Sequence, residues 1–205
     1  MNFRPLITSL AIAFAAAAYA QDAPTLRVRV TDVKSAPVQT PQFQISNIPA
    51  KPYRPKTWLE IDVTFDAEKT AKGLAESGPF VDGLEFKYYV ALNKQRGAPP
   101  KTILLTGTIN YSNIAVKEKS HALAFVSPAS LSRLLDKTDF TVGDIKAVGV
   151  EVTAGGQPTG GGKSTQAGKF WENLSAFDVT DGLILPKFKT PFAPAWGDYD
   201  VEVKP

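Results

Sequence analysis

The run Leu84–Leu92, LEFKYYVAL, constrains the fold of this chain more than any other stretch. Every second side chain in it is apolar or aromatic, namely Leu84, Phe86, Tyr88, Val90 and Leu92. Because successive side chains of a strand point to opposite faces, this alternation builds one apolar face and one wetter face. A helix would scatter the same residues around its axis. The run therefore predicts a long strand, central to its sheet, with one face in a hydrophobic core.

The same alternation recurs along the chain. It appears first in Leu26–Asp32 and Thr57–Phe65, which we expect to be antiparallel neighbours because consecutive strands usually pair. Between them, Ser35–Pro55 carries five prolines around Phe43-Gln44-Ile45, and this pattern predicts an edge strand and an irregular crossover. Further strands are expected at Thr102–Tyr111, His121–Val126, Ile145–Thr153, Phe170–Val179, Leu183–Phe188 and Tyr199–Val203.

Two short helices interrupt the strands. The first is expected to be capped by Asp66 and to end at Gly73 or Gly78, and the second begins with the start signal Ser127-Pro128. About ten strands with turn signals between them predict an all-β fold, mainly β with two short helices. We expect an antiparallel, immunoglobulin-like β-sandwich with insertions, although the Cys-Trp-Cys hallmark of antibody domains is absent.

The N-terminus has the layout of a secretory signal peptide. Arg4 precedes an apolar run from Leu6 to Ala18, and Ala18-Tyr19-Ala20 forms an A-x-A cleavage signal before Gln21. The sequence thus predicts a signal peptide over residues 1–20 and a single β-sandwich domain over residues 21–205. The run is shorter than the ~20 residues that span a bilayer, which argues against the alternative of a membrane anchor. No later stretch is apolar enough to cross a membrane, so the mature protein is not expected to be embedded in one.

The composition of the chain excludes some classes of function. The chain has no cysteine, which excludes a disulfide framework and thiol chemistry in an exported protein. Of 23 basic and 20 acidic residues, Arg4 leaves with the signal, so the mature charge is 22 − 20 = +2. A balance this mild gives no reason to expect a nucleic-acid partner.

The motifs give no catalytic, cofactor or metal site. Gly155–Ser164, GGQPTGGGKS, has Gln157 where a phosphate-binding loop needs its first glycine, so we interpret Ala154–Gly168 as a flexible surface loop. His121 is the only histidine and belongs to no catalytic or zinc motif; a solvated strand position is expected for it. The acidic residues near Asp181-Gly182 lack calcium-loop spacing and indicate a hairpin turn. The sequence therefore predicts no enzyme and no cofactor.

Aromatic residues are the candidates for ligand or partner contact. Trp58, Tyr89 and Trp171 fall on positions that alternation assigns away from the core or leaves ambiguous. Exposed rings on a sheet can stack on sugars or anchor a protein partner. The alternative is that these rings pack under loops or under the Pro-rich crossover. The Pro-rich aromatic segment Phe188–Trp196, FKTPFAPAW, is expected to lie across the sandwich as a cover.

Three stretches carry a resemblance: LRVRVTDV at Leu26–Val33, TWLEIDVTF at Thr57–Phe65 and PFAPAWGDYDVEV at Pro191–Val203. With them the chain resembles a small secreted protein encoded beside a type IV pilus-like cluster in Verrucomicrobia of the Akkermansia kind. This resemblance implies an immunoglobulin-like fold, an envelope or surface location and a non-enzymatic role in pilus assembly, adhesion or host contact. It transfers no functional residue.

The residues limit that role. A type IV pilin keeps its apolar N-terminal helix after cleavage at a preceding glycine, whereas here the cleavage signal follows the apolar run Leu6–Ala18. The chain is therefore expected to be an accessory or surface component with a protein partner, in the periplasm, at the outer membrane or outside the cell. Two alternatives stay open: a carbohydrate-binding β-sandwich with a glycan ligand, and a periplasmic chaperone that donates a strand to a client.

Overall fold

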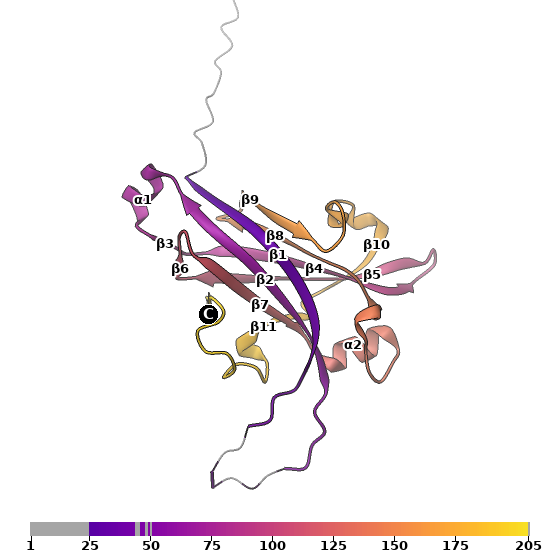
Figure 1. The fold of residues 1–205 in the computed structure, drawn as a ribbon. Helices are drawn as coiled ribbons and strands as arrows, with labels where there is room; N and C mark the ends of the chain where they lie inside the picture. The colour runs from indigo at the N-terminus through magenta and orange to yellow at the C-terminus, as the bar shows by residue number, and fades with distance from the viewer. Residues whose placement is uncertain (1–24, 44–45, 48, 50, 205) are drawn as a thin grey trace, which may run out of the picture.

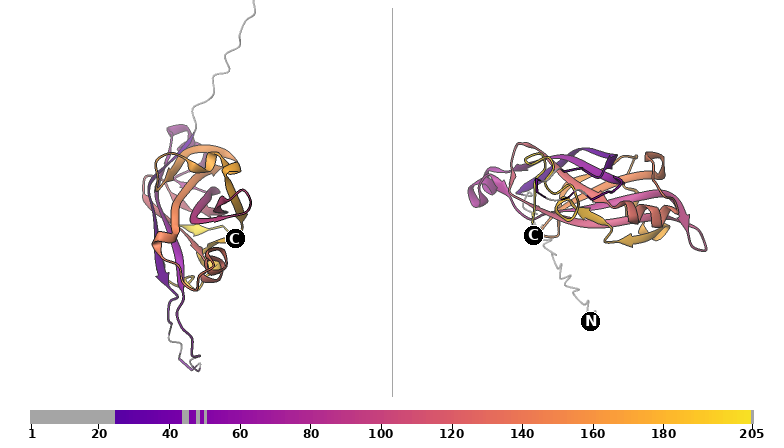
Figure 2. Two further views of the ribbon diagram at one scale, coloured as in Figure 1. Left: turned by 90° about the vertical axis from the view of Figure 1, so that its right-hand side faces the viewer. Right: turned by 90° about the horizontal axis from the view of Figure 1, so that it is seen from below.

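The computed structural model describes residues 25–204, apart from 44–45, 48 and 50. The predicted signal peptide, residues 1–20, lies outside the described residues. The described chain forms two packed β-sheets (Figures 1 and 2). The smaller sheet has the order β1-β2-β7-β11, with β1 at Leu26–Gln39, β2 at Thr57–Lys69, β7 at Lys119–Val126 and β11 at Ile184–Pro186. This arrangement confirms the all-β sandwich.

The larger sheet has the order β10-β5-β4-β8-β9, and β12 also pairs with β5. Its strands are β4 (Leu84–Arg96), β5 (Lys101–Ser112), β8 (Ile145–Ala154), β9 (Gln157–Ser164), β10 (Phe177–Asp181) and β12 (Glu202–Val203). Two short strands, β3 (Phe80–Val81) and β6 (Ile114–Ala115), form a separate pair. Because β4 lies between β5 and β8, it is the central strand that the alternation predicted.

The core lies between the two sheets and is built from the alternating faces. All five predicted inward residues of β4, from Leu84 to Leu92, are buried, whereas Lys87 on the other face is exposed. Phe86 meets Phe65 of β2 edge-on across the core, with ring centroids 4.9 Å apart. Edge-to-face pairs of this kind add to the burial of the two rings. The register predicted for this strand is confirmed.

Strands β1 and β2 pair antiparallel, as expected, but both are longer than predicted. β1 continues past Asp32 through Ala36-Pro37 to Gln39, with a bulge between Val30 and Asp32. β1 is an edge strand of the smaller sheet, so a proline can face away from the ladder without losing a bond. The described parts of the connection between these strands, which has no strand structure, extend below the sandwich (Figure 1).

One pairing departs from the antiparallel expectation: β10 runs parallel to β5. β9 and β10 are opposite edges of the larger sheet, and the connection between them carries the short 3-10 helices η2 (Phe170–Glu172) and η3 (Leu174–Ala176). This connection, residues 165–176, crosses the outer face of the sheet, which brings β10 to β5 in the parallel sense. Much of the predicted strand Phe170–Val179 is therefore helical turn.

The prediction of a flexible surface loop at Ala154–Gly168 is wrong, because most of this stretch is the edge strand β9. The hairpin turns at Gly155-Gly156, and β9 then packs beside β1 at the edge where the two sheets approach each other. Gly161 has no side chain, and a Cβ there would lie 3.3 Å from the Cβ of Val28. Its glycines, which suggested flexibility, let this strand fit closely against the other sheet.

The first helix begins later than predicted. β2 runs on through Asp66 to Lys69, and α1 (Ala71–Ser77) is capped by Thr70, whose hydroxyl accepts from the Gly73 amide at 3.3 Å. Asp66 instead pairs with Arg29 of β1 at 3.0 Å. A residue of a long strand cannot cap a helix.

The second helix, α2 (Pro128–Leu135), begins at the predicted Ser127-Pro128 signal and buries Leu131, Leu134 and Leu135. A 3-10 turn, η1 (Val142–Asp144), follows it before β8. None of the helices in the described ranges is long and apolar enough to cross a membrane.

Candidate functional site

The C-terminal segment Lys187–Val203, here called the strap, lies over the outer face of the smaller sheet. It leaves β11 through the 3-10 turn η4 (Lys187–Lys189) and returns to β5 of the larger sheet as β12. Phe192 is buried and stacks on Phe125 of β7, with ring centroids 4.7 Å apart and planes at 9°. The strap is the yellow segment beside β7 and β11 in Figure 1. The cover predicted for Phe188–Trp196 is thus present.

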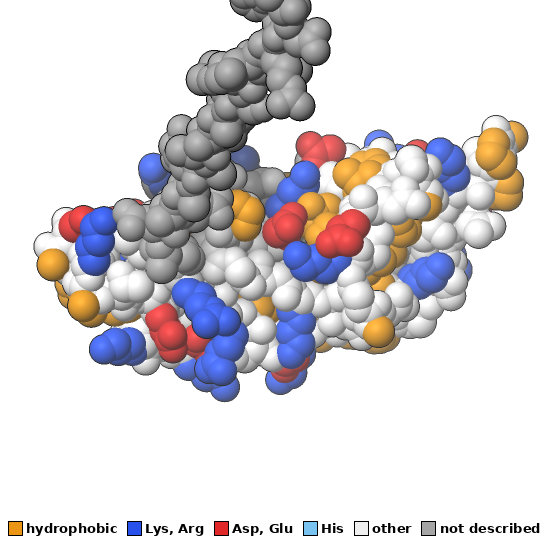
Figure 3. Space-filling view, turned by 90° about the horizontal axis from the view of Figure 1, so that it is seen from above, with side chains coloured by type: hydrophobic (Ala, Val, Ile, Leu, Met, Phe, Trp, Pro, Cys, Tyr) orange, Lys and Arg blue, Asp and Glu red, His pale blue; other side chains and the backbone are white. Residues whose placement is uncertain are grey.

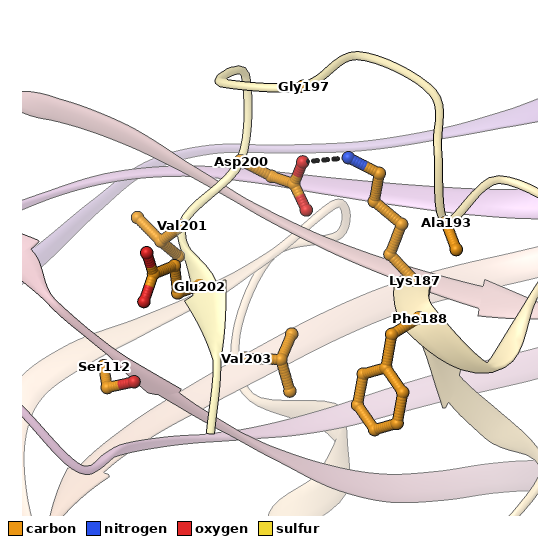
Figure 4. A pocket seen from close by; sticks show the side chains of 9 residues that line it. All are labelled: Ser112, Lys187, Phe188, Ala193, Gly197, Asp200, Val201, Glu202 and Val203. Atoms are coloured by element: carbon orange, nitrogen blue, oxygen red, sulfur yellow. Dashed lines mark hydrogen bonds and ion pairs between the residues drawn. The ribbon is translucent and has the colours of Figure 1, made fainter. Parts of the chain in front are cut away.

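A buried ion pair fastens the two ends of the strap. Lys187 Nζ lies 2.5 Å from Asp200 Oδ1, and the two side chains are only 9% and 7% exposed. Figure 4 shows this contact spanning the upper side of a pocket. Burying either charge alone is costly, so the pair keeps Lys187 and Asp200, and with them the two ends of the strap, close together.

The pocket beneath the ion pair has a volume of about 480 Å³. Phe188, Val201 and Val203 give it an apolar lining, and Ser112 and Glu202 lie at its side (Figure 4). Glu202 accepts a hydrogen bond from the Asn113 amide, so its charge is engaged at the rim. An apolar hollow with a few polar groups suits an apolar side chain of a partner.

The strap also exposes three large aromatic side chains. Phe188 is 53% exposed, and Trp196 and Tyr199 are each 47% exposed. The inner face of Trp196 stacks on Phe192 at 5.6 Å between centroids, so the ring is fixed although it is accessible. The sequence indicated a cover here but not that part of it would remain open, because proline-rich aromatic segments give no alternation from which exposure could be read.

On the sheet beneath the strap, Asp62 of β2 joins two aromatic groups. It lies 2.9 Å from Nδ1 of His121 and accepts a hydrogen bond of 2.7 Å from the Tyr199 hydroxyl. Partial burial, followed by this bond, raises the pKa of Tyr199 to about 12, so the phenol stays protonated as a donor. His121 is therefore part of the contact that docks the strap, which the sequence did not indicate.

Two of the predicted contact residues lie together on the opposite side of the molecule. Tyr89 and Trp171 stack face to face on the outer face of the larger sheet, 4.9 Å apart and 7° from parallel. They are 3% and 4% exposed. The Trp171 ring fits because Gly149 of β8 lacks a side chain, and a Cβ there would lie 2.0 Å from the ring. The two rings are therefore packed against each other and against the sheet.

Trp58 is not brought near that pair. It lies half-buried on the outer face of the smaller sheet, edge-on to Phe192 at 5.8 Å, and its indole donates to the Thr40 hydroxyl at 3.2 Å. The packing alternative raised from the sequence describes the positions of Trp58, Tyr89 and Trp171. On the strap, by contrast, the rings of Phe188, Trp196 and Tyr199 are accessible.

Charge and metal-ligand geometry add little to the site. In the part of the chain that the structure describes, no group of three or more His, Cys, Asp and Glu side chains could hold a metal ion. Seen from above, Lys and Arg side chains stand beside Asp and Glu over much of the surface (Figure 3). Such mixing resembles an ordinary solvated surface more than a nucleic-acid interface.

Together, the fold and the strap define a β-sandwich protein whose C-terminal segment covers one sheet and presents aromatic side chains. A protein-family model matches residues 19–205, and the chain belongs to that family, in agreement with its resemblance to a pilus-associated protein of the Akkermansia kind. Among solved structures, a crystal structure from Akkermansia muciniphila matches with a TM-score of 0.72 and 23% identity, over 88% of this chain and 94% of that one. That likeness shows the fold. No curated protein sequence matches the chain.

Proposed function

We propose that this chain is a non-enzymatic, exported accessory or surface component of a type IV pilus-like system, and that it binds a protein partner through the strap. The observation that carries the proposal is the exposure of Phe188, Trp196 and Tyr199 on one segment that a buried ion pair holds in place. Family membership supports the pilus association.

The physical argument concerns preorganisation. Interfaces draw most of their binding energy from a few aromatic anchors that are desolvated on association. A ring that is already ordered loses little conformational freedom when it binds. Trp196 is ordered by stacking on Phe192, and Tyr199 by its bond to Asp62. Phe188 lies beside the apolar pocket, so a partner side chain could fill that pocket and cover the ring together.

The experiment compares two variants for association with purified pilus and envelope proteins of the producing bacterium. The triple variant F188A/W196A/Y199A should lose the partner that the wild-type protein retains. Phe80→Ala is the matched control, because Phe80 is 53% exposed but lies outside the strap. Equal retention by both variants would show that the partner does not use the strap.

Export is a second component of the proposal. It rests on the A-x-A signal before Gln21. Sequencing the N-terminus of protein recovered from the cell envelope should give Gln21 as the first residue. Recovery with residues 1–20 attached would contradict cleavage, and recovery from the cytosol alone would contradict the location.

Glycan binding is the competing function, and it would also need accessible ring faces. Tyr89 and Trp171 stack on each other, which favours a protein partner over a sugar-binding platform on the larger sheet. Trp196 and Tyr199 are the rings through which a glycan could still be held. A glycan array probed with wild type and with W196A separates the two, because a signal lost in W196A would favour the glycan.

A further inference from the structure

A second hollow lies between the strap and the sheet, lined by Glu60, Asp62, Leu123, Trp196 and Tyr199. Its volume is about 280 Å³, several times the ~30 Å³ that one water molecule occupies in the liquid. It is therefore large enough for one long side chain. Both hollows have two carboxylates in their lining, but those of the pocket in Figure 4 are held by Lys187 and Asn113, whereas Glu60 has no such partner among the described residues.

Glu60 is the unusual group in this hollow. It is half-buried on β2, and its cross-strand neighbours are Ala36 of β1 and Phe125 of β7, neither of which can neutralise a charge. Among the described residues, none donates a hydrogen bond to its carboxylate, and none forms an ion pair with it. Burial raises the pKa of Glu60, and the negative charges of Asp62 and Asp200 raise it further.

The other carboxylates near Glu60 already have partners. Asp200 is paired with Lys187, and Asp62 is bonded to His121 and Tyr199. Among the residues that the structure describes, the negative charge of Glu60 is therefore left without a partner. Proteins rarely keep a partly buried charge unpaired, because its desolvation is not repaid. An external cation would repay it.

Two aromatic rings complete the hollow. Trp196 and Tyr199 both line it and are each about half exposed. A cation over the face of a tryptophan or tyrosine ring is attracted by the ring quadrupole, most strongly with tryptophan. A carboxylate beside such rings suits a cation on an apolar stem, and the alkyl stem would contact Leu123 and the rings.

We propose that the hollow between Glu60, Trp196 and Tyr199 binds the cationic end of a lysine or arginine side chain of a polypeptide partner. This inference rests on the proposed function, whose partner would supply that side chain. It adds a chemical requirement to it, because an apolar partner residue alone would leave Glu60 unpaired.

The test titrates the full-length mature chain with blocked tripeptides, Gly-Lys-Gly and Gly-Arg-Gly, and with the uncharged isostere Gly-norleucine-Gly. The readout is the NMR signal of the Trp196 indole N–H, with those of Trp58 and Trp171 as internal references outside the hollow. Both cationic peptides should shift the Trp196 signal alone, and added salt should weaken the effect because it screens charges. An equal response to the norleucine peptide would overturn the proposal.

Variants locate the binding. Glu60→Gln should raise the Kd for the lysine peptide by about tenfold, as expected for a partly desolvated charge pair. Trp196→Leu should raise it several-fold by removing the ring. The matched control is Glu118→Gln, since Glu118 is exposed and lines neither this hollow nor the apolar pocket. Unchanged affinity in Glu60→Gln, with the spectrum of a folded protein, would overturn the site.

Butylamine distinguishes the two possible sources of the cation, a polypeptide side chain and a free amine. Binding of butylamine as tightly as the lysine peptide would show a site for free amines and overturn the assignment to a polypeptide. Failure here is separable from failure of the proposed function. Suppose that the strap variant loses its envelope partner but no cationic peptide binds the wild type. The proposed cation site is then wrong, whereas the proposed role of the strap in partner binding is supported.

Discussion

The hydroxyl groups of Tyr88 and Tyr111 lie 2.9 Å apart in the centre of the core. Tyr111 also donates to the carbonyl of Leu123 at 3.0 Å, so a chain of hydrogen bonds runs from β4 and β5 of the larger sheet to β7 of the smaller one. Both rings are fully buried, and burial is the main reason why the pKa of each phenol is raised. The bridge therefore stays protonated and joins the two sheets.

The two tyrosines should respond differently to removal of their hydroxyl groups. Tyr88→Phe ends the chain early but leaves Tyr111 bonded to Leu123, so the loss should be about 1 kcal/mol. Tyr111→Phe leaves both the Tyr88 hydroxyl and the Leu123 carbonyl without that partner and should cost about 2–3 kcal/mol. Urea unfolding of both variants measures the difference. Equal losses would contradict a chain that passes through Tyr111.

The central strand gives a prediction about register. Phe86→Ala removes a fully buried ring and should cost about 3–5 kcal/mol, including the cavity that remains. Lys87→Ala, on the exposed face, should change stability by no more than about 0.5 kcal/mol. Denaturant melts of the two variants provide the comparison. A slip of one residue would exchange the two results, because each side chain would move to the other face.

Glu60 predicts a pH-dependent stability. Because its pKa is raised in the folded state, the folded chain holds this proton more tightly than the unfolded chain does. Stability from this group is therefore fully present below its unfolded pKa and falls as pH rises through the folded one. Glu60→Gln should raise the free energy of unfolding at pH 7. The gain should vanish below about pH 4, where the carboxyl of the unfolded chain is also protonated. Melts at several pH values check this, and a gain independent of pH would refute it.

The ion pair of the strap predicts strong coupling. Asp200→Asn leaves the Lys187 charge buried and should cost about 3–5 kcal/mol, whereas the double variant K187M/D200L should regain most of that loss. Asp66→Asn is the control, because it breaks the pair with Arg29, which is 71% exposed, and should cost less than about 1 kcal/mol. Urea melts give all three values. A double variant no more stable than D200N would show that the charges are not coupled.

The sequence predicted best where hydrophobic alternation is strong. Leu84–Leu92 and Thr57–Phe65 alternate cleanly, and both have the register expected of them. β9 escaped prediction because its residues are mostly glycine and polar, and it is a strand only by pairing with β8 and packing on β1. Its order comes from contacts distant in sequence, which local pattern does not record.

The candidate site was less predictable for the same reason. The hollow at Glu60 depends on Trp196 and Tyr199, which lie more than a hundred residues further along the chain. Glu60 by itself is an ordinary outward residue of an alternating strand. Trp58, Tyr89 and Trp171 stood out by residue type, but the crossing of residues 165–176 and of the strap covers them. Which ring stays open is decided by these crossings.

The last strands of the chain join the two sheets alternately, and this order has a consequence for folding during synthesis. β10 joins the larger sheet, β11 the smaller one, and β12 the larger one again, all after residue 176. Until those residues are synthesised, the outer edges of β5 and β7 have no partner strand. An edge left open invites pairing with other chains.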